Sequence, residues 1–292
     1  MKFWIVTPSF NQLGWLKLCV NSVADQATEG IEVHHHIQDA CSTDGTAEWL
    51  AEYVSQQSST TNYQLTFASE ADEGMYDAIN RGWKLAPGDV DIIAHLNCDE
   101  QYLPNALKAI AAFMNTHPKA DVVLADMIVV DNVGAYICHR RSLKPYAVTS
   151  RFCCGGMTAT TFQRASVTKE KGVFFDTKWK NIGDKVWYNM LHVAGCHFVV
   201  CNQMVSLFTD TGSNLNWTEG GRLEKRKYEQ EFLQGLELGV NLISRINGIR
   251  RYIKEYTLRP PYEYSFYQNP DVPRASILVE SPRGVWHKKW TT

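Results

Sequence analysis

Residues 92–100 read Ile-Ile-Ala-His-Leu-Asn-Cys-Asp-Glu, a hydrophobic run that ends in polar and acidic side chains. This pattern is typical of a buried strand that carries ligand-binding residues at its carboxyl end. The same arrangement precedes it three times, with strands expected over residues 3–6, 33–38 and 63–68. Polar loops follow these strands and contain Thr7, Asp39 and Asp72. Because the carboxyl ends of parallel strands meet at one edge of a sheet, we predict a ligand site there.

Helical spacing of apolar residues separates the expected strands. It predicts helices over residues 13–23, 47–54, 76–85, 103–113 and 184–194. Strands that alternate with helices predict an α/β fold with a mostly parallel sheet flanked by helices. Residues 121–130 and 135–139 resemble a strand-turn-strand pair, whereas residues 150–207 are less regular.

A densely charged helical pattern covers residues 218–256 and ends before Pro260-Pro261, after which an aromatic, proline-containing tail follows. We therefore expect one α/β domain over residues 1–215 and a helical and irregular C-terminal extension over residues 216–292.

The composition restricts the function classes. With 45% hydrophobic and 21% charged residues and a net charge of -2, the chain is an ordinary globular protein with no general attraction to nucleic acid. No run of about 18 apolar residues occurs, so we expect no membrane-spanning helix and no signal peptide. Eight cysteines without repeated CxxC pairs indicate free thiols in a reducing cytoplasm, not a zinc site or a disulfide scaffold.

Residues 69–82 place acidic side chains and a glycine directly before a helix. On that helix Asp77, Asn80 and Arg81 lie on a polar side suited to sugar hydroxyls or phosphate. By contrast, three successive histidines at residues 34–36 cannot converge on one metal ion, because alternate side chains of a strand point to opposite faces.

Five motifs in order resemble the family 2 glycosyltransferases, which are inverting enzymes with a GT-A fold. They lie at residues 7–11, 22–26, 39–46, 69–82 and 96–104, and begin Thr-Pro-Ser-Phe-Asn. The resemblance is strong over residues 3–135 and weaker to about residue 210. The sequence departs from the family pattern at two places. Ala40-Cys41 replaces a glycine pair, which can alter the backbone of this loop because only glycine adopts positive φ at low cost. Glu100 replaces the usual second aspartate.

The resemblance implies a donor site for a nucleotide diphosphate sugar. Asp99 would hold Mn²⁺ or Mg²⁺, and the alternative is a helix cap near Pro104. Asp39 would contact the base, or else form an Asx-turn. The remaining donor-side residues implied by the resemblance are Thr7 and Pro8 in the base pocket, Asp72 near the ribose or diphosphate, Arg81 at the phosphates or sugar, and Asn97. For Arg81 the alternative is an ion-paired surface side chain.

The resemblance also implies a catalytic base at the start of a helix, in the motif at residues 181–191. Asp184 is the carboxylate of that motif and would take the proton of the acceptor hydroxyl. The alternative is a capping role, and a helix N-terminus is expected to lower its pKa. The threonines of residues 157–162 are expected on the acceptor side.

The last quarter of the chain is basic and aromatic, with Arg245 to Lys254 and His287-Lys288-Lys289 between two tryptophans. One hypothesis places this end against anionic lipid headgroups. The alternative is a solvated helix with a self-packing tail or a tail that forms a homodimer.

We therefore expect transfer from a UDP-sugar to a glycan or lipid-linked acceptor, in the cytoplasm or at the inner face of the membrane, in bacterial surface-polysaccharide assembly. One rival is a nucleotide-sugar-binding protein without transferase activity. The other is a nucleotidyltransferase, which is disfavoured because no glycine-rich phosphate loop follows the first strand.

Overall fold

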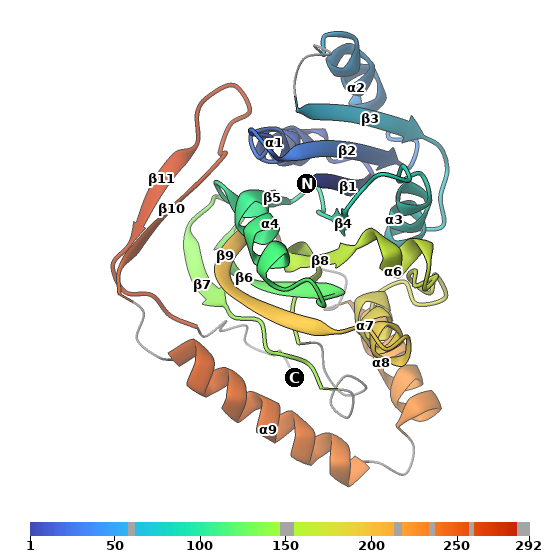
Figure 1. Ribbon diagram of the computed structural model, residues 1–292, viewed down its shortest axis with the longest axis vertical. Coiled ribbons are helices and arrows are strands. Elements are labelled where there is room, and N and C mark those ends of the chain that lie inside the picture. Colours follow the sequence, from blue (N-terminus) through green and yellow to red (C-terminus); the bar gives the residue numbers. More distant parts are fainter. Residues whose placement is uncertain (58–61, 147–154, 213–217, 234–236, 257–259, 285–292) are drawn as a thin grey trace.

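The computed structural model describes residues 1–57, 62–146, 155–212, 218–233, 237–256 and 260–284. Its centre is a nine-stranded sheet in the order β3-β2-β1-β4-β8-β6-β9-β5, with β7 paired to β6 (Figure 1). The strands are β1 Lys2–Ser9, β2 Glu32–Asp39, β3 Tyr63–Ser69, β4 Ile92–His95, β5 Glu100–Tyr102, β6 Val122–Asp131, β7 Tyr136–Arg140, β8 Thr161–Arg164 and β9 Phe198–Asp210.

The half of the sheet formed by β3, β2, β1 and β4 is parallel throughout. Its register places Ser9 beside Asp39, and Asp39 beside Ser69, so three strands end at one edge. The α/β class and the common edge predicted from the sequence are confirmed. Beyond β4 the sheet is mixed, because β8 runs antiparallel to both of its neighbours while β6 and β9 are parallel.

Helices cover both faces of the sheet, as the alternating pattern predicts. The helices are α1 Leu13–Ala24, α2 Thr46–Ser55, α3 Met75–Lys84, α4 Ala106–Thr116, α6 Ala165–Lys169, α7 Gly183–Val193, α8 Glu219–Phe232 and α9 Glu237–Tyr256, with a 3-10 turn at Thr158–Thr160. Successive β1 side chains point to opposite faces. Phe3 and Ile5 accordingly join the core under α1 and α4, whereas Trp4 and Val6 join the core under α3 and α7.

Strand β9 lies in a stretch that the sequence pattern treats as irregular, and this expectation is wrong. The polar Asn202 and Gln203 interrupt its apolar run, and the register between β6 and β9 shifts around Asp126. A broken pattern of this kind is weak evidence for a strand when it is considered alone. The partner strand β6, buried along nearly its whole length, stabilises it.

The aromatic tail forms a hairpin of β10 Tyr262–Phe266 and β11 Ala275–Val279, which runs beside β7 and β9 in Figure 1. Tyr264 and Phe266 pack on Ile128 and Leu207 of the central sheet. The hairpin therefore adds to the core of the α/β domain.

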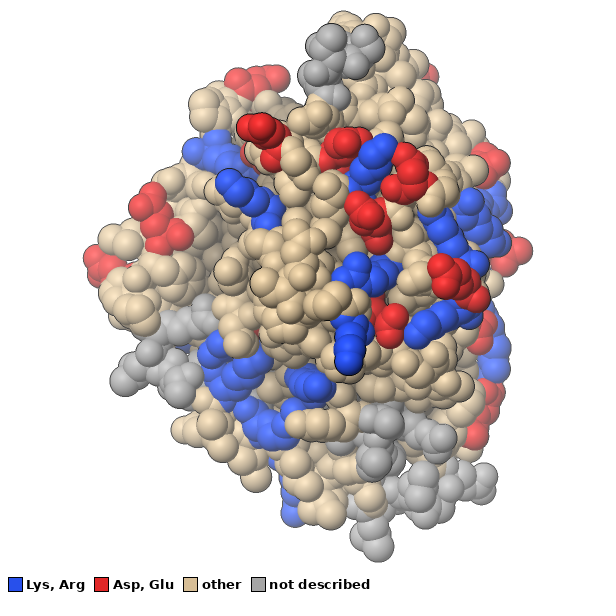
Figure 2. Space-filling view, in the orientation of Figure 1, with Lys and Arg blue, Asp and Glu red and all other residues tan. Residues whose placement is uncertain are grey.

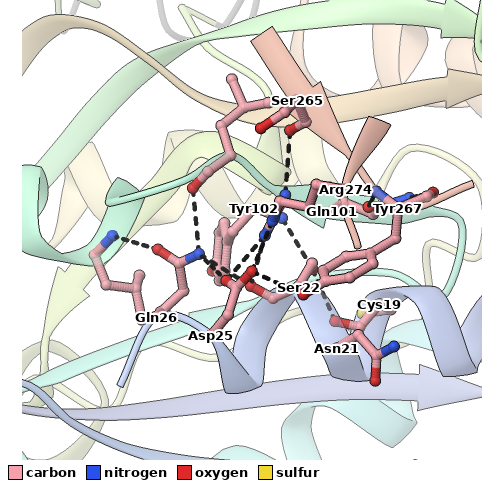
Figure 3. Close-up of polar contacts among 12 residues, drawn as sticks. Cys19, Asn21, Ser22, Asp25, Gln26, Gln101, Tyr102, Ser265, Tyr267 and Arg274 are labelled. Atoms are coloured by element: carbon pink, nitrogen blue, oxygen red, sulfur yellow. Dashed lines mark hydrogen bonds and ion pairs between the residues drawn. The ribbon is translucent and has the colours of Figure 1, made fainter. Parts of the chain in front are cut away.

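Figure 3 shows how polar contacts tie the hairpin to α1 and β5. Arg274 donates from Nε and Nη2 to the two carboxylate oxygens of Asp25, at 2.6 and 2.9 Å. Gln101 pairs with both backbone groups of Tyr267, each at 2.8 Å. Hydrogen bonds in which both partners are charged are stronger than neutral ones.

Candidate active site

A cleft of about 790 Å³ opens at the carboxyl edge of the parallel strands. Loops after β1, β2, β3 and β4 line it, together with the start of α7 and the end of β9. Among the residues predicted for the site, five line this cleft: Pro8, Asp72, Asn97, Asp99 and Asp184. Met157 and Thr158 line it as well, which places part of the segment expected on the acceptor side in the same cavity.

Thr7 does not line the cleft, which corrects its assignment to the donor pocket. Its hydroxyl is fully buried and lies 2.8 Å from Nε2 of His35 on the neighbouring strand. Alternation along β1 explains the difference, because adjacent residues of a strand point to opposite faces. His35 also contacts the hydroxyl of Tyr63, so Thr7 is part of a buried polar chain between strands.

Asp39 is fully buried, and its side chain stabilises the loop that follows β2. Its carboxylate accepts hydrogen bonds from the backbone N–H and hydroxyl of Ser42, at 3.0 and 2.5 Å, and from the hydroxyl of Ser69 at 2.6 Å. This is the Asx-turn alternative, and Asp39 is not among the residues that line the cleft. In the same loop Cys41 adopts a φ of 57°, so the departure from glycine leaves a non-glycine residue in the left-handed region.

Arg81 is ion-paired within its own segment and does not line the cleft. Its guanidinium lies 2.8 Å from the carboxylate of Asp77 and 3.1 Å from that of Glu70. Asn80, expected on the ligand-facing side of this helix, is buried instead and makes two hydrogen bonds with the backbone of Phe175. The acidic stretch is therefore largely a self-paired turn, from which Asp72 reaches the cleft.

Asp99 and Glu100 bring two carboxyl groups to the cleft after β4. Burial raises the pKa of both, and the charge of Asp99 raises the pKa of Glu100 further. Glu100 accepts a hydrogen bond from the backbone N–H of Asn97 at 2.8 Å. The side-chain oxygen of Asn97 is buried without a hydrogen-bond partner among the described residues. Carboxylate and amide oxygens are the ligands that Mg²⁺ and Mn²⁺ prefer, so this donor set fits either ion.

A pre-built cage for such an ion is not found within the described residues, since no group of three or more His, Cys, Asp or Glu side chains there could hold a metal. One or two carboxylates are sufficient where substrate phosphates and water complete the coordination. Asp99 and Asn97 are the residues best placed to do so.

Asp184 enters the cleft because α7 begins in close contact with α3. A Cβ atom added at Gly183 would lie 2.6 Å from the ring of Tyr76, so only glycine permits this approach. The backbone N–H of Asp184 donates to the hydroxyl of Tyr76 at 3.1 Å. The side chain does not cap α7, whose N-cap is Ile182.

The pKa of Asp184 is raised, which corrects the expectation that the helix N-terminus would lower it. Burial is the largest cause and disfavours the charged form. A hydrogen bond from the backbone N–H of Lys185, at 2.7 Å, and the charge of Lys185 act in the opposite direction but do not prevail. The loss of hydration on burial therefore raises the pKa of Asp184 by more than the N-terminus of α7 lowers it.

Glu224 is a residue that the sequence pattern does not single out, because it is one of many charges on α8. Its carboxylate accepts three backbone hydrogen bonds, from Lys180, Asn181 and Ile182, at 2.9, 2.8 and 3.2 Å. These three residues directly precede α7, so the C-terminal extension holds the segment that carries Asp184. Beneath this contact Tyr228 of α8 packs in a common apolar cluster with Ile182.

We expect Glu224→Ala to lower the free energy of unfolding by about 1–3 kcal/mol, because three backbone donors lose a charged acceptor. For a transferase of the kind that the sequence resembles, turnover should fall while the affinity for the donor nucleotide changes little, since Glu224 lies outside the lining of the cleft. Denaturant unfolding and steady-state kinetics measure the two effects. Glu229→Ala on the same helix is the matched control, and an equal loss of turnover in that variant would contradict the role of Glu224.

The sequence and the fold of this chain are similar to those of known glycosyltransferases. Residues 4–203 match the family model described as glycosyl transferase family 2. A PGL/p-HBAD biosynthesis glycosyltransferase of Mycobacterium tuberculosis is 31% identical over 128 residues, which are 44% of this chain and 47% of that protein. The poly(ribitol-phosphate) beta-N-acetylglucosaminyltransferase TarS of Staphylococcus aureus is 24% identical over 189 residues, which are 64% of this chain and 32% of TarS. The chain thus matches less than half the length of either relative.

Solved structures show the same fold. The crystal structure of S. aureus TarS 1-349 in complex with UDP-GlcNAc has a TM-score of 0.58 at 20% identity and covers 74% of this chain and 61% of that one. The mannosyltransferase PcManGT from Pyrobaculum calidifontis, in complex with GDP-Man and Mn²⁺, has a TM-score of 0.52 at 14% identity. That match covers 70% of this chain and 56% of PcManGT.

Proposed function

Because the chain belongs to glycosyl transferase family 2, we propose that it transfers a sugar from a nucleotide diphosphate sugar to an acceptor hydroxyl with inversion of the anomeric carbon. The observation that carries this proposal is that one cleft is lined by both Asp99, which follows β4, and Asp184, at the start of α7. A carboxylate suited to the diphosphate side and a carboxyl group suited to proton transfer therefore lie in the same cavity.

On the donor side, Asp99 and the buried side-chain oxygen of Asn97 would hold Mn²⁺ or Mg²⁺. Such an ion, when bound, supplies Lewis-acid stabilisation of the diphosphate leaving group. Asp72 lies in the same cleft, where it would approach the ribose or the diphosphate.

Asp184 acts as the general base in this proposal. The acceptor oxygen forms a bond to the anomeric carbon as the bond to the diphosphate oxygen breaks, and the electron pair of that bond leaves with the nucleoside diphosphate. The proton of the acceptor hydroxyl passes to the carboxylate of Asp184. A raised pKa makes this carboxylate a stronger base than an exposed aspartate.

UDP is the nucleotide we propose, because TarS, which has the same fold, binds UDP-GlcNAc. The acceptor we propose is a glycan or a lipid-linked acceptor in bacterial surface-polysaccharide assembly at the inner face of the membrane. The curated relatives carry the names of glycosyltransferases of PGL/p-HBAD biosynthesis and of poly(ribitol-phosphate). Among the described residues, no helix combines the length and apolar character needed to cross a bilayer.

A thermal-shift screen of UDP-, GDP- and dTDP-sugars, each with Mn²⁺, Mg²⁺ or a chelator, tests the donor. A ligand at a hundred times its Kd adds about 2.7 kcal/mol to the free energy of unfolding, so the matching donor should raise the melting temperature clearly. We expect the UDP-sugars to do so with the metal present. Donor binding without either sugar transfer or slow donor hydrolysis would instead identify a binding protein that lacks transferase activity.

A further inference from the structure

Helix α9 presents an apolar stripe to solvent. Leu242, Ile246, Ile249 and Ile253 are 60%, 45%, 59% and 62% exposed. Their spacing of four, three and four residues places them on one face of the helix. Tyr252, 60% exposed, lies at the margin of this stripe. Scattered exposed apolar residues are ordinary, but a continuous helical stripe indicates a surface that another partner covers.

Hydrogen bonds of the described residues hold the polar side of α9 against the protein, where Asn247 is buried. Arg250 donates to the backbone carbonyl of Lys144 at 3.0 Å, and Lys254 donates to the carbonyl of Ser142. Arg141 in turn donates to the carbonyl of Lys254 at 3.1 Å. The polar side of α9 is therefore held against the protein, and this arrangement directs the apolar stripe outward.

The charged residues of α9 between its two ends are all basic. These residues are Arg245, Arg250, Arg251 and Lys254, whereas the acidic residues Glu237 and Glu255 lie at the ends of the helix. Figure 2 shows basic side chains, and no acidic ones among the coloured residues, over the region where α9 lies in Figure 1. An apolar stripe with the exposed Arg245 beside it, on a basic face of the protein, matches a surface that is apolar in depth and negatively charged above it.

We propose that α9 binds the surface of an anionic lipid bilayer, with the stripe among the acyl chains and the exposed Arg245 at the headgroups. The stripe is roughly 16 Å long from Leu242 to Ile253, which suits a helix lying in the interface and is too short to span a bilayer. A second copy of the chain is a poorer occupant, because two apposed α9 helices would bring like charges together. This surface is separate from the cleft, so the inference does not depend on sugar transfer.

Flotation of the full-length protein with vesicles tests the proposal. We expect it to float with vesicles of phosphatidylglycerol and phosphatidylcholine and to do so much less with phosphatidylcholine alone. The double variant Ile246→Asp/Ile249→Asp should lower binding at least about tenfold, because two aliphatic side chains leave the acyl layer. The matched control is Val193→Asp/Leu223→Asp, which adds the same charge at exposed apolar residues of α7 and α8.

Melting temperature and donor binding show whether each variant is folded, independently of lipid. Full-length protein that fails to float with anionic vesicles would overturn the proposal, as would an equal loss of binding in the control variant. A concentration-dependent dimer that the Ile246→Asp/Ile249→Asp change abolishes, with no lipid binding, would assign the stripe to a second copy instead.

Discussion

Asp184→Asn should lower kcat by at least about a hundredfold, the scale of general-base catalysis, and leave the affinity for the donor nucleotide nearly unchanged. The substitution keeps the shape of the side chain and removes its ability to accept the proton. Single-turnover kinetics and donor titration measure the two quantities separately. Asp176→Asn is the matched control, because Asp176 lies on the segment before α7 but does not line the cleft. Near-normal turnover of the Asp184 variant would remove this residue from the mechanism.

The pH dependence of the wild-type protein follows from the same carboxyl group. A general base must be deprotonated to act, and burial raises the pKa of Asp184 above the ordinary 3.8. As the pH is lowered, activity should therefore begin to fall at a higher pH than it would with an exposed aspartate as the base. The free energy of unfolding depends on pH in the opposite direction. Between the ordinary and the raised pKa the folded state binds more protons, so stability decreases as pH rises through that window. At pH 7 Asp184→Asn should therefore be at least as stable as the wild type, which denaturant unfolding can measure.

Asp99→Asn should reduce turnover by about 10²–10³-fold, the scale measured when one preorganised electrostatic group is removed from an active site. Donor binding should also lose its dependence on Mn²⁺ or Mg²⁺, because a neutral amide replaces the carboxylate that we assign to the ion. Calorimetric titration of the donor with metal and with a chelator measures this. Asp89→Asn is the matched control, since Asp89 is exposed and ion-paired with Lys2. Donor binding that still responds to metal in the Asp99 variant would contradict this assignment.

Much of the site could be predicted because it depends on short-range patterns. Residues that follow successive parallel strands must meet at one edge, and two of the four side chains expected there, Asp72 and Asp99, line the cleft. Thr7 and Asp39 show where such reasoning stops. The hydroxyl of Thr7 contacts His35, and the carboxylate of Asp39 accepts hydrogen bonds from the loop that follows its strand.

The sequence by itself determined the α/β class, the parallel half of the sheet and the edge at which the cleft opens, because apolar periodicity sets which face of each element is buried. Only the tertiary structure decided that Asp39 serves its own loop, that burial raises the pKa of Asp184 and that α9 turns its apolar stripe outward. Each of these depends on which groups lie nearby in space. Glu224 lies more than forty residues after the segment it holds. Hydrogen bonds and desolvation act between groups in contact, whatever their separation along the chain.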